Sequence, residues 1–301
     1  MQPSVIHIAR KETAAFFASP AAFIFFGAFL LVALFLFFWV DTFFARNIAD
    51  VRPLFEWMPV LLIFLVAALT MRMWSEERRS GTLEFLLTQP VSPLRFVLGK
   101  FIACLTLVGI ALVLTLPLPV TVAFLGNLDW GPVFGAYVAT LFLAAAYISV
   151  GLTVSAKSDS QIASLIVTVL VCSGFYLIGS STLTSLVGNR PGELLQAMGT
   201  GSRFSSITRG VIDLRDLYYY LSIIGVFLSL NVYFLESGRW ATETRSTSHA
   251  RWRTITALLA ANFVAGNLRL SQINWARADI TEGKIYSISD ATRGYLAQLR
   301  E

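Results

Sequence analysis

Long apolar runs alternate with short charged segments along the chain. Six runs lack Asp, Glu, Lys and Arg and come close to, or exceed, the roughly 20 residues that a membrane-spanning helix needs. They cover approximately residues 20–40, 57–71, 101–126, 133–156, 162–182 and 217–235. A seventh run, residues 255–273, is a weaker candidate because it contains Asn262, Asn267 and Arg269. The pattern predicts an all-α polytopic membrane protein with six spans and a seventh candidate span.

Composition supports this class. The 301 residues are 56% hydrophobic and 14% charged, whereas a soluble domain carries about 25% charged residues. Cys104 and Cys172 both fall within predicted spans, so we interpret them as small packing residues and expect no disulfide framework. His7 and His249 lie outside the spans and far apart in the sequence, which argues against a haem or metal site.

The distribution of Lys and Arg predicts the orientation of the chain. An N-terminus in the cytoplasm places Arg10, Lys11, Arg72, Arg78, Arg79, Arg95, Lys100, Lys157, Arg239, Arg245, Arg251 and Arg253 in cytoplasmic segments. The arginines predicted to lie outside are spread over longer segments. The net charge of +5 then suits an anionic inner membrane leaflet, and we expect lipids and no nucleic acid as partners.

The chain lacks an energy source of its own. Its predicted spans from the third to the sixth contain no charged side chains of the kind that relay protons. A phosphate-binding loop of the form G-x-x-x-x-G-K-[ST] is also absent, because Gly99-Lys100 and Gly283-Lys284 are followed by Phe and Ile. We therefore expect no enzyme activity and no cofactor bound by this chain. ATP and Mg would belong to a partner subunit.

A charged segment, residues 75–93, separates the second and third predicted spans. Glu76 to Arg79 form a charged turn, after which three leucines recur at helical spacing, and prolines then stop the helix. This pattern predicts a short amphipathic helix on the membrane surface. Its charges either contact lipid head groups or meet a soluble partner, and the pattern alone leaves both interpretations open.

The same segment resembles the loop between the second and third spans of type-2 ABC permeases, which has the form E-E-x-x-x-G-T-x-E-x-L-x-x-x-P. The matching residues are Glu76, Glu77, Gly81, Thr82, Glu84, Leu86 and Pro90. In that family the loop is the coupling helix, which docks on the ATPase subunit. The resemblance implies that the ATPase-coupling residues are Glu76, Glu77, Arg78, Arg79, Thr82, Leu83, Glu84, Leu86 and Leu87.

Three further segments are similar to the same family, in the same order along the chain. Residues 11–25 are similar to its amphipathic N-terminal segment, residues 155–166 to its turn between the fourth and fifth spans, and residues 203–240 to the gliding-motility permease subgroup. The resemblance implies an N-terminal segment over residues 1–19 and a six-span ABC exporter permease over residues 20–240. It also implies a location in the bacterial inner membrane.

The predicted outer segment, residues 182–216, contains the charged group Arg209, Asp213, Arg215 and Asp216. These residues form either a locally paired cluster or a possible outer site that contacts substrate. An amphipathic stretch from Glu193 to Met198 indicates a helix there, which the resemblance also implies. Pro117 and Pro119 predict a kink in the third span, because each removes a backbone hydrogen bond.

The last segment, residues 241–301, carries the seventh candidate span. Within it, residues 277–299 resemble the beginning of the periplasmic auxiliary subunit of gliding-motility permeases, with matches at Asp279, Thr281, Tyr286, Ser287 and Ser289. The resemblance implies either the permease half of a longer fusion or a lost auxiliary module. A periplasmic auxiliary protein is therefore a possible partner.

Two functional classes remain. The chain is either the membrane subunit of an ATP-driven exporter or a subunit that transmits ATP-driven motion to an outer apparatus without cargo. A membrane scaffold without an ATPase leaves the match over residues 76–90 unexplained. Both classes require a cytoplasmic ATP-binding subunit, and the resemblance implies a second permease copy or a close relative, with two permeases on two ATPases.

Overall fold

Apolar runs of this length fold into helices, because a helix satisfies its own backbone hydrogen bonds where no water is available. The structure is a computed structural model that describes residues 4–46, 48–89, 91–180, 183–185, 189–237, 247–270 and 277–279. The helices are α1 (Val5–Phe17), α2 (Ala21–Phe35), the π-helix η1 (Leu36–Val40), α3 (Phe43–Arg46), α4 (Arg52–Thr70), α5 (Ser75–Arg79), α6 (Thr82–Thr88), α7 (Pro93–Val113), α8 (Pro117–Leu125), α9 (Trp130–Lys157), α10 (Gln161–Ile178), α12 (Asn189–Met198), α13 (Thr200–Thr208), α14 (Leu214–Ser237) and α15 (Thr247–Leu270). Two short strands, β1 (Val211–Asp213) and β2 (Arg277–Asp279), pair in antiparallel register.

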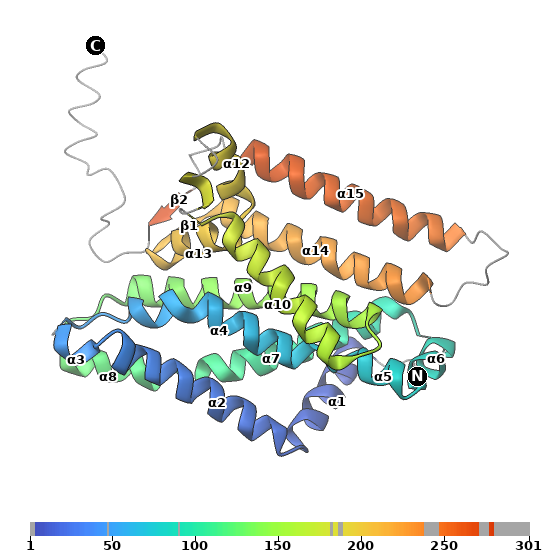
Figure 1. Ribbon diagram of the computed structural model, residues 1–301, viewed down its shortest axis with the longest axis horizontal. Coiled ribbons are helices and arrows are strands. Elements are labelled where there is room, and N and C mark those ends of the chain that lie inside the picture. The colour runs from blue at the N-terminus through green and yellow to red at the C-terminus, as the bar shows by residue number, and fades with distance from the viewer. Residues whose placement is uncertain are drawn as a thin grey trace, which may run out of the picture.

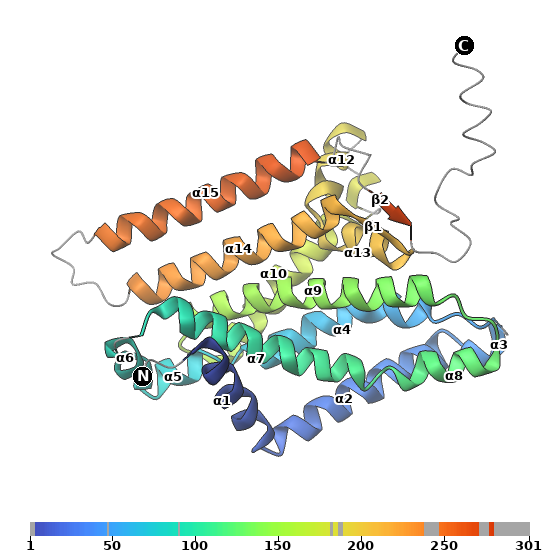
Figure 2. The same ribbon diagram turned by 180° about the vertical axis from the view of Figure 1, so that it is seen from behind.

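The long helices lie side by side along the longest axis of the molecule, while the short elements gather at its two ends (Figure 1). Helices α5 and α6 lie at one end, which we call the α5–α6 end. Helix α3, helix α13 and strand β1 lie at the opposite end, which we call the far end. Seen from behind, α1 crosses α7 near the α5–α6 end (Figure 2).

Six helical segments in the described part of the chain are long and apolar enough to cross a membrane, which confirms the six predicted spans. They are Ala22–Arg46, Arg52–Arg79, Pro93–Leu125, Trp130–Lys157, Gln161–Ile178 and Leu214–Ser237. The second span begins earlier than the apolar run at residues 57–71, because its first turns carry the charged residues Arg52 and Glu56. Apolar runs therefore locate the spans but not their charged ends.

The predicted kink in the third span is confirmed. Helix α7 ends at Val113 and α8 begins at Pro117. Proline suits the first turn of a helix but cannot donate a backbone hydrogen bond within one. Between the two helices, Thr115 Oγ1 donates to the carbonyl of Leu112 at 2.7 Å and lies 2.9 Å from Tyr137 Oη.

The seventh candidate run forms a helix, but α15 is not among the six segments apolar enough to span a membrane in the described residues. It lies beside α14 in both views (Figures 1 and 2). Its polar residues bond to α14, since Asn267 Nδ2 donates to Ser222 Oγ at 3.2 Å and Tyr218 Oη donates to the Asn262 carbonyl at 3.3 Å. Residues 271–273 of the predicted run lie outside the described residues.

The predicted outer helix is present as α12, followed by α13. Strand β1 comes next and pairs with β2, with Asp213 opposite Arg277 and Val211 opposite Asp279. The backbone at residues 277–279 is thus held at the far end. The remaining part of the segment that resembles an auxiliary subunit, residues 280–299, lies outside the described residues, and that resemblance stays a prediction.

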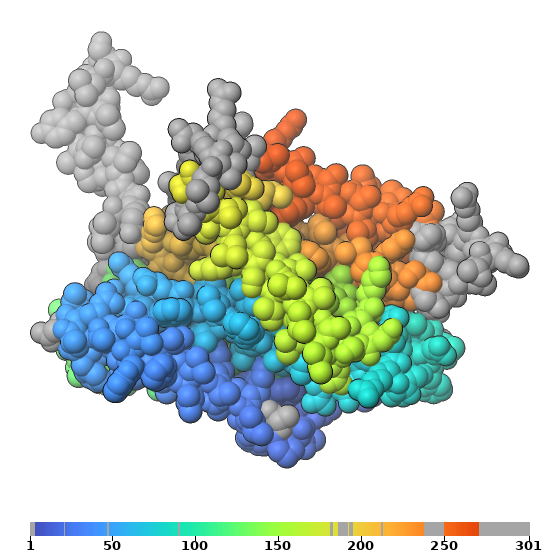
Figure 3. Space-filling model, viewed as in Figure 1, coloured from blue at the N-terminus to red at the C-terminus, as the bar shows by residue number. Residues whose placement is uncertain are grey.

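Helix α9 is the most buried span, whereas α10 lies on the surface, as Figure 3 shows. Small side chains let neighbours approach α9 closely. A methyl group added at Gly151 would come within 2.9 Å of Thr70 Cβ on α4 and 3.2 Å of Thr168 Cγ2 on α10. Thr153 Oγ1 on α9 donates to the carbonyl of Phe227 on α14 at 2.7 Å. The absence of a side chain at Gly151 therefore sets the distance between three spans.

We expect Gly151→Ala to destabilise the protein, although alanine is the better helix former. The added methyl group meets a Cβ atom, which cannot rotate away, so the helices must separate at a cost of about 1–3 kcal/mol. Gly109→Ala in α7 is the matched control, because a methyl group there has nothing within 4 Å. Thermal melting in detergent should separate the two variants. Gly109→Ala should be as stable as the unmodified protein, or more stable by the helix-propensity gain of up to about 1 kcal/mol. Equal melting temperatures would contradict the close packing at Gly151.

Candidate functional site

The charged segment between the second and third spans folds as two short helices. The predicted charged turn at Glu76–Arg79 is helix α5, and the predicted amphipathic helix is α6. Gly81 joins them with a φ of 72°, a conformation that favours glycine because it has no Cβ atom. Thr82 Oγ1 donates back to the carbonyl of Glu77 at 3.2 Å and fixes the bend. Pro90 lies outside the described residues.

The leucines of α6 face the protein. Leu83 is buried in the core, and Leu86 and Leu87 are half-buried against it. The opposite face is open, and the exposed residues predicted for coupling are Glu76, Arg79, Thr82 and Glu84. Phe85, which the sequence interpretation missed, lies among them with an exposed fraction of 70%. The sequence signal for Phe85 was an aromatic residue that does not share the helical spacing of the three leucines.

Glu77 points inward and does not share this exposed face. Its Oε1 lies 2.8 Å from Lys100 Nζ, and the Lys100 side chain is only 2% exposed. Lys100 also donates to Glu12 Oε1 at 3.3 Å and to the Met73 carbonyl at 2.8 Å, and it lies 4.7 Å from the ring centre of Trp74. These five residues form what we call the Lys100 cluster. The sequence signal was a lysine inside an apolar helical pattern, since a buried lysine needs partners.

The Lys100 cluster fixes helix α1 against α7 and α5. Glu12 belongs to α1, Lys100 to α7 and Glu77 to α5. One residue before Lys100, a methyl group added at Gly99 would lie 2.7 Å from Cβ of Ile8 on α1. Charge pairing and close packing thus hold the N-terminal helix in place at the α5–α6 end.

Helix α5 also contacts the turn between α9 and α10. Ser155 Oγ on α9 accepts hydrogen bonds from the backbone amides of Trp74 at 3.1 Å and Ser75 at 3.2 Å. Arg78 donates to the carbonyl of Ala156, and its Nε lies 3.6 Å from Asp159 Oδ1. The predicted cytoplasmic turn is therefore a direct neighbour of α5.

The predicted outer cluster separates into two ion pairs and one remaining arginine. Arg215 Nε lies 2.9 Å from Asp213 Oδ2, and Arg203 Nη1 lies 3.0 Å from Asp216 Oδ1. All four of these side chains are largely buried. Arg209, the remaining predicted residue, is exposed and lines a cavity.

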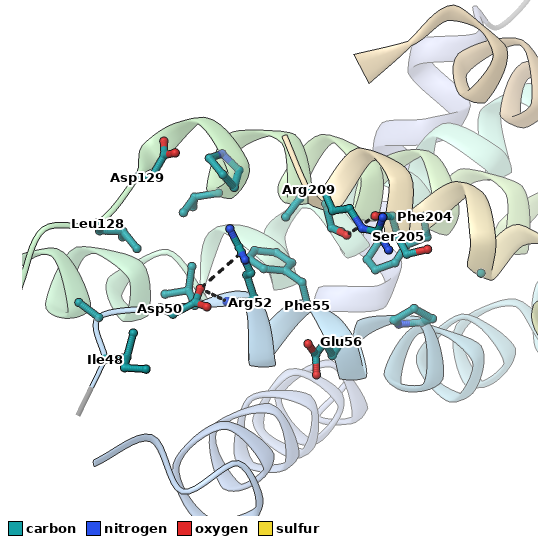
Figure 4. Close-up of a pocket in the computed structure, with 18 of the residues that line it drawn as sticks. Ile48, Asp50, Arg52, Phe55, Glu56, Leu128, Asp129, Phe204, Ser205 and Arg209 are labelled. Carbon is teal, nitrogen blue, oxygen red and sulfur yellow. Dashed lines mark hydrogen bonds and ion pairs between the residues drawn. The ribbon is translucent and has the colours of Figure 1, made fainter. Parts of the chain in front are cut away.

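This far-end cavity has a volume of about 660 Å³ and lies between the first turns of α4, the start of α9, and α13 (Figure 4). Phe55 and Phe204 form part of its apolar wall, and both are almost fully buried. Arg209, which follows α13, and Glu56 of α4 line different sides of it. The sequence did not predict this cavity, because it is assembled from segments that are far apart along the chain.

Comparison with known families agrees with these features. A set of long apolar helices, with a pair of short helices between the second and third spans, defines a polytopic membrane protein. The family model described as ABC-2 family transporter protein matches residues 6–266, so the chain belongs to this family. No curated protein matches the chain. Members of this family are the permease subunits of ABC transporters, and ATP is bound by a partner subunit.

We expect Lys100→Met to destabilise the protein by about 2–4 kcal/mol, because it leaves the carboxylates of Glu77 and Glu12 without their buried partner. Adding Glu77→Gln should recover part of this loss, and a double-mutant cycle followed by thermal melting measures the coupling between the two residues. Arg72→Met is the matched control. Its pair with Glu76 is exposed at 46% and 52%, so its loss should cost less than about 0.5 kcal/mol. Equal losses for both variants would refute the special role of Lys100.

Proposed function

We propose that this chain is a permease subunit that couples ATP hydrolysis by a separate cytoplasmic subunit to export across the bacterial inner membrane. One observation carries the proposal. The face of α5 and α6 that carries Glu76, Arg79, Glu84 and Phe85 is exposed, while the other face is fixed to several spans. An exposed aromatic side chain beside charges is typical of a protein interface.

The contacts behind α5 support transmission of motion into the membrane. Lys100 joins α5 to α1 and α7, while Ser155 and Arg78 join it to α9. A partner that displaces α5 therefore displaces these helices with it. Glu77 and Arg78 form these internal contacts. The exposed residues of α5 and α6 that contact the ATPase are Glu76, Arg79, Glu84 and Phe85.

The assembly that we propose holds two permeases, either two copies or one copy with a close relative. Each chain offers a single α5–α6 pair, whereas two ATP-binding subunits that close on each other need one each. Exposed apolar side chains on α10, such as Ile162 and Leu170, suit contact with lipid or with this second permease. A periplasmic auxiliary partner rests on the resemblance of residues 277–299 alone.

The far-end cavity favours export over the cargo-free alternative. Transmission of force alone needs no ligand-sized space, whereas a volume of about 660 Å³ lies within the range of small-molecule sites, about 300–1,000 Å³. The N-terminus in the cytoplasm and the far end outside give this cavity an outward position, in agreement with the distribution of Lys and Arg.

The coupling role is tested with the purified chain and its ATP-binding subunit. We expect no ATP hydrolysis by the chain alone, and we expect Phe85→Ala to weaken assembly with the ATPase about tenfold or more, because it removes a central aromatic contact. Glu84→Arg should reduce permease-dependent ATP hydrolysis by reversing an exposed charge of the same helix. Phe44→Ala is the matched control, since Phe44 is 71% exposed but lies at the far end. Full assembly and hydrolysis with both α6 variants would exclude α6 as the docking helix.

Orientation is tested by labelling single cysteines. A cysteine at Ser80, which is exposed between α5 and α6, should react with an impermeant reagent only from the cytoplasm, and one at Asn127 only from outside. The background is low, because Cys104 and Cys172 are both buried. Labelling of Ser80 from outside would invert the proposed topology.

A further inference from the structure

Charged residues of both signs line the far-end cavity. Asp50 Oδ1 lies 3.9 Å from Arg52 Nε and accepts from the Arg52 amide at 2.9 Å, so these two charges offset each other. Asp129 accepts from the Gly131 amide at 2.9 Å at the start of α9. Among the charged residues that line the cavity, Glu56 and Arg209 are the two for which the described part of the chain provides no partner.

The two unpaired charges belong to different elements. Glu56 is on α4 and Arg209 follows the last turn of α13, and they lie on different sides of the cavity (Figure 4). Opposite charges that line one cavity without pairing suit a ligand that carries both signs. An arginine binds a phosphate through parallel hydrogen bonds, and a carboxylate accepts from an ammonium group.

Part of the remaining wall is apolar, and Asn127, Ser205 and Thr208 add polar groups to it. Phe55, Val133 and Phe204 line the cavity and are almost fully buried. Pro59, which lies within α4, lines the cavity beside them. A ligand that fills this space therefore has an apolar part as well as a charged head.

We propose that the far-end cavity binds a zwitterionic amphiphile, with its phosphate on Arg209, its ammonium on Glu56 and its apolar part against Phe55 and Phe204. This proposal adds a ligand class to the export function proposed above. It is nevertheless tested on the isolated permease without ATP. Ligand binding can therefore fail while ATPase coupling succeeds, and the reverse.

The test is calorimetric titration of the purified full chain in detergent with dihexanoyl-phosphatidylethanolamine, which is zwitterionic, and dihexanoyl-phosphatidylglycerol, which is anionic. We expect the zwitterion to bind about fivefold more tightly, the equivalent of about 1 kcal/mol. Glu56→Gln should remove this preference, because it removes the partner of the ammonium. Arg209→Gln should weaken both lipids about fivefold, because both carry a phosphate.

Three controls keep the result decisive. Arg46→Gln changes an exposed far-end arginine that does not line the cavity, and it should leave both affinities unchanged. Glu56→Asp and Arg209→Lys retain the charges and should retain the order of the two lipids, which separates a charge effect from a folding defect. Glycerophosphoethanolamine supplies the head group without acyl chains and should bind more weakly than the lipid.

Four results would overturn the proposal. They are no saturable binding of the zwitterionic lipid, equal or tighter binding of the anionic lipid, glutamine variants that behave like the unmodified protein, and glycerophosphoethanolamine that binds as tightly as the lipid. The last result would identify a site for a polar solute, because the apolar wall would then contribute nothing.

Discussion

An ammonium group that is almost removed from water must be surrounded by acceptors, and Lys100 imposes this constraint on the α5–α6 end. Its three acceptors come from α1, from α5 and from the turn after α4, while Lys100 itself belongs to α7. Each acceptor offsets part of the same desolvation cost, so losing one weakens the position of the others. The arrangement therefore holds four chain segments as one unit.

This constraint separates two kinds of charge in the segment between the second and third spans. Glu77 and Arg78 bond within the protein, whereas Glu76, Arg79 and Glu84 remain accessible. Adjacent residues in the Glu-Glu-Arg-Arg run at residues 76–79 thus have different roles. A helix turns by 100° per residue, so neighbours in the sequence face different directions. The sequence shows the charges but not which of them bond within the protein and which remain accessible.

What the sequence predicts here is local, and what it misses is long-range. The six spans, the inward face of Leu83, Leu86 and Leu87, and the break before Pro117 each follow from a pattern within one segment. The Lys100 cluster joins residues that are 23 and 88 positions apart, and periodicity carries no information on such a pairing. The far-end cavity was missed for the same reason, and the outer residues predicted as one group separate into two ion pairs and Arg209, which lines the cavity.

Helix α9 is a single unbroken helix whose two ends reach the far-end cavity and helix α5. Its first turn borders the cavity, and Ser155 in its last turn caps α5. Its 28 residues span about 42 Å at the helical rise of about 1.5 Å per residue. A tilt of about 5° around its midpoint would move each end by roughly 2 Å, in opposite directions. By lever geometry alone, a displacement of one end of α9 therefore produces a displacement of equal size and opposite direction at its other end.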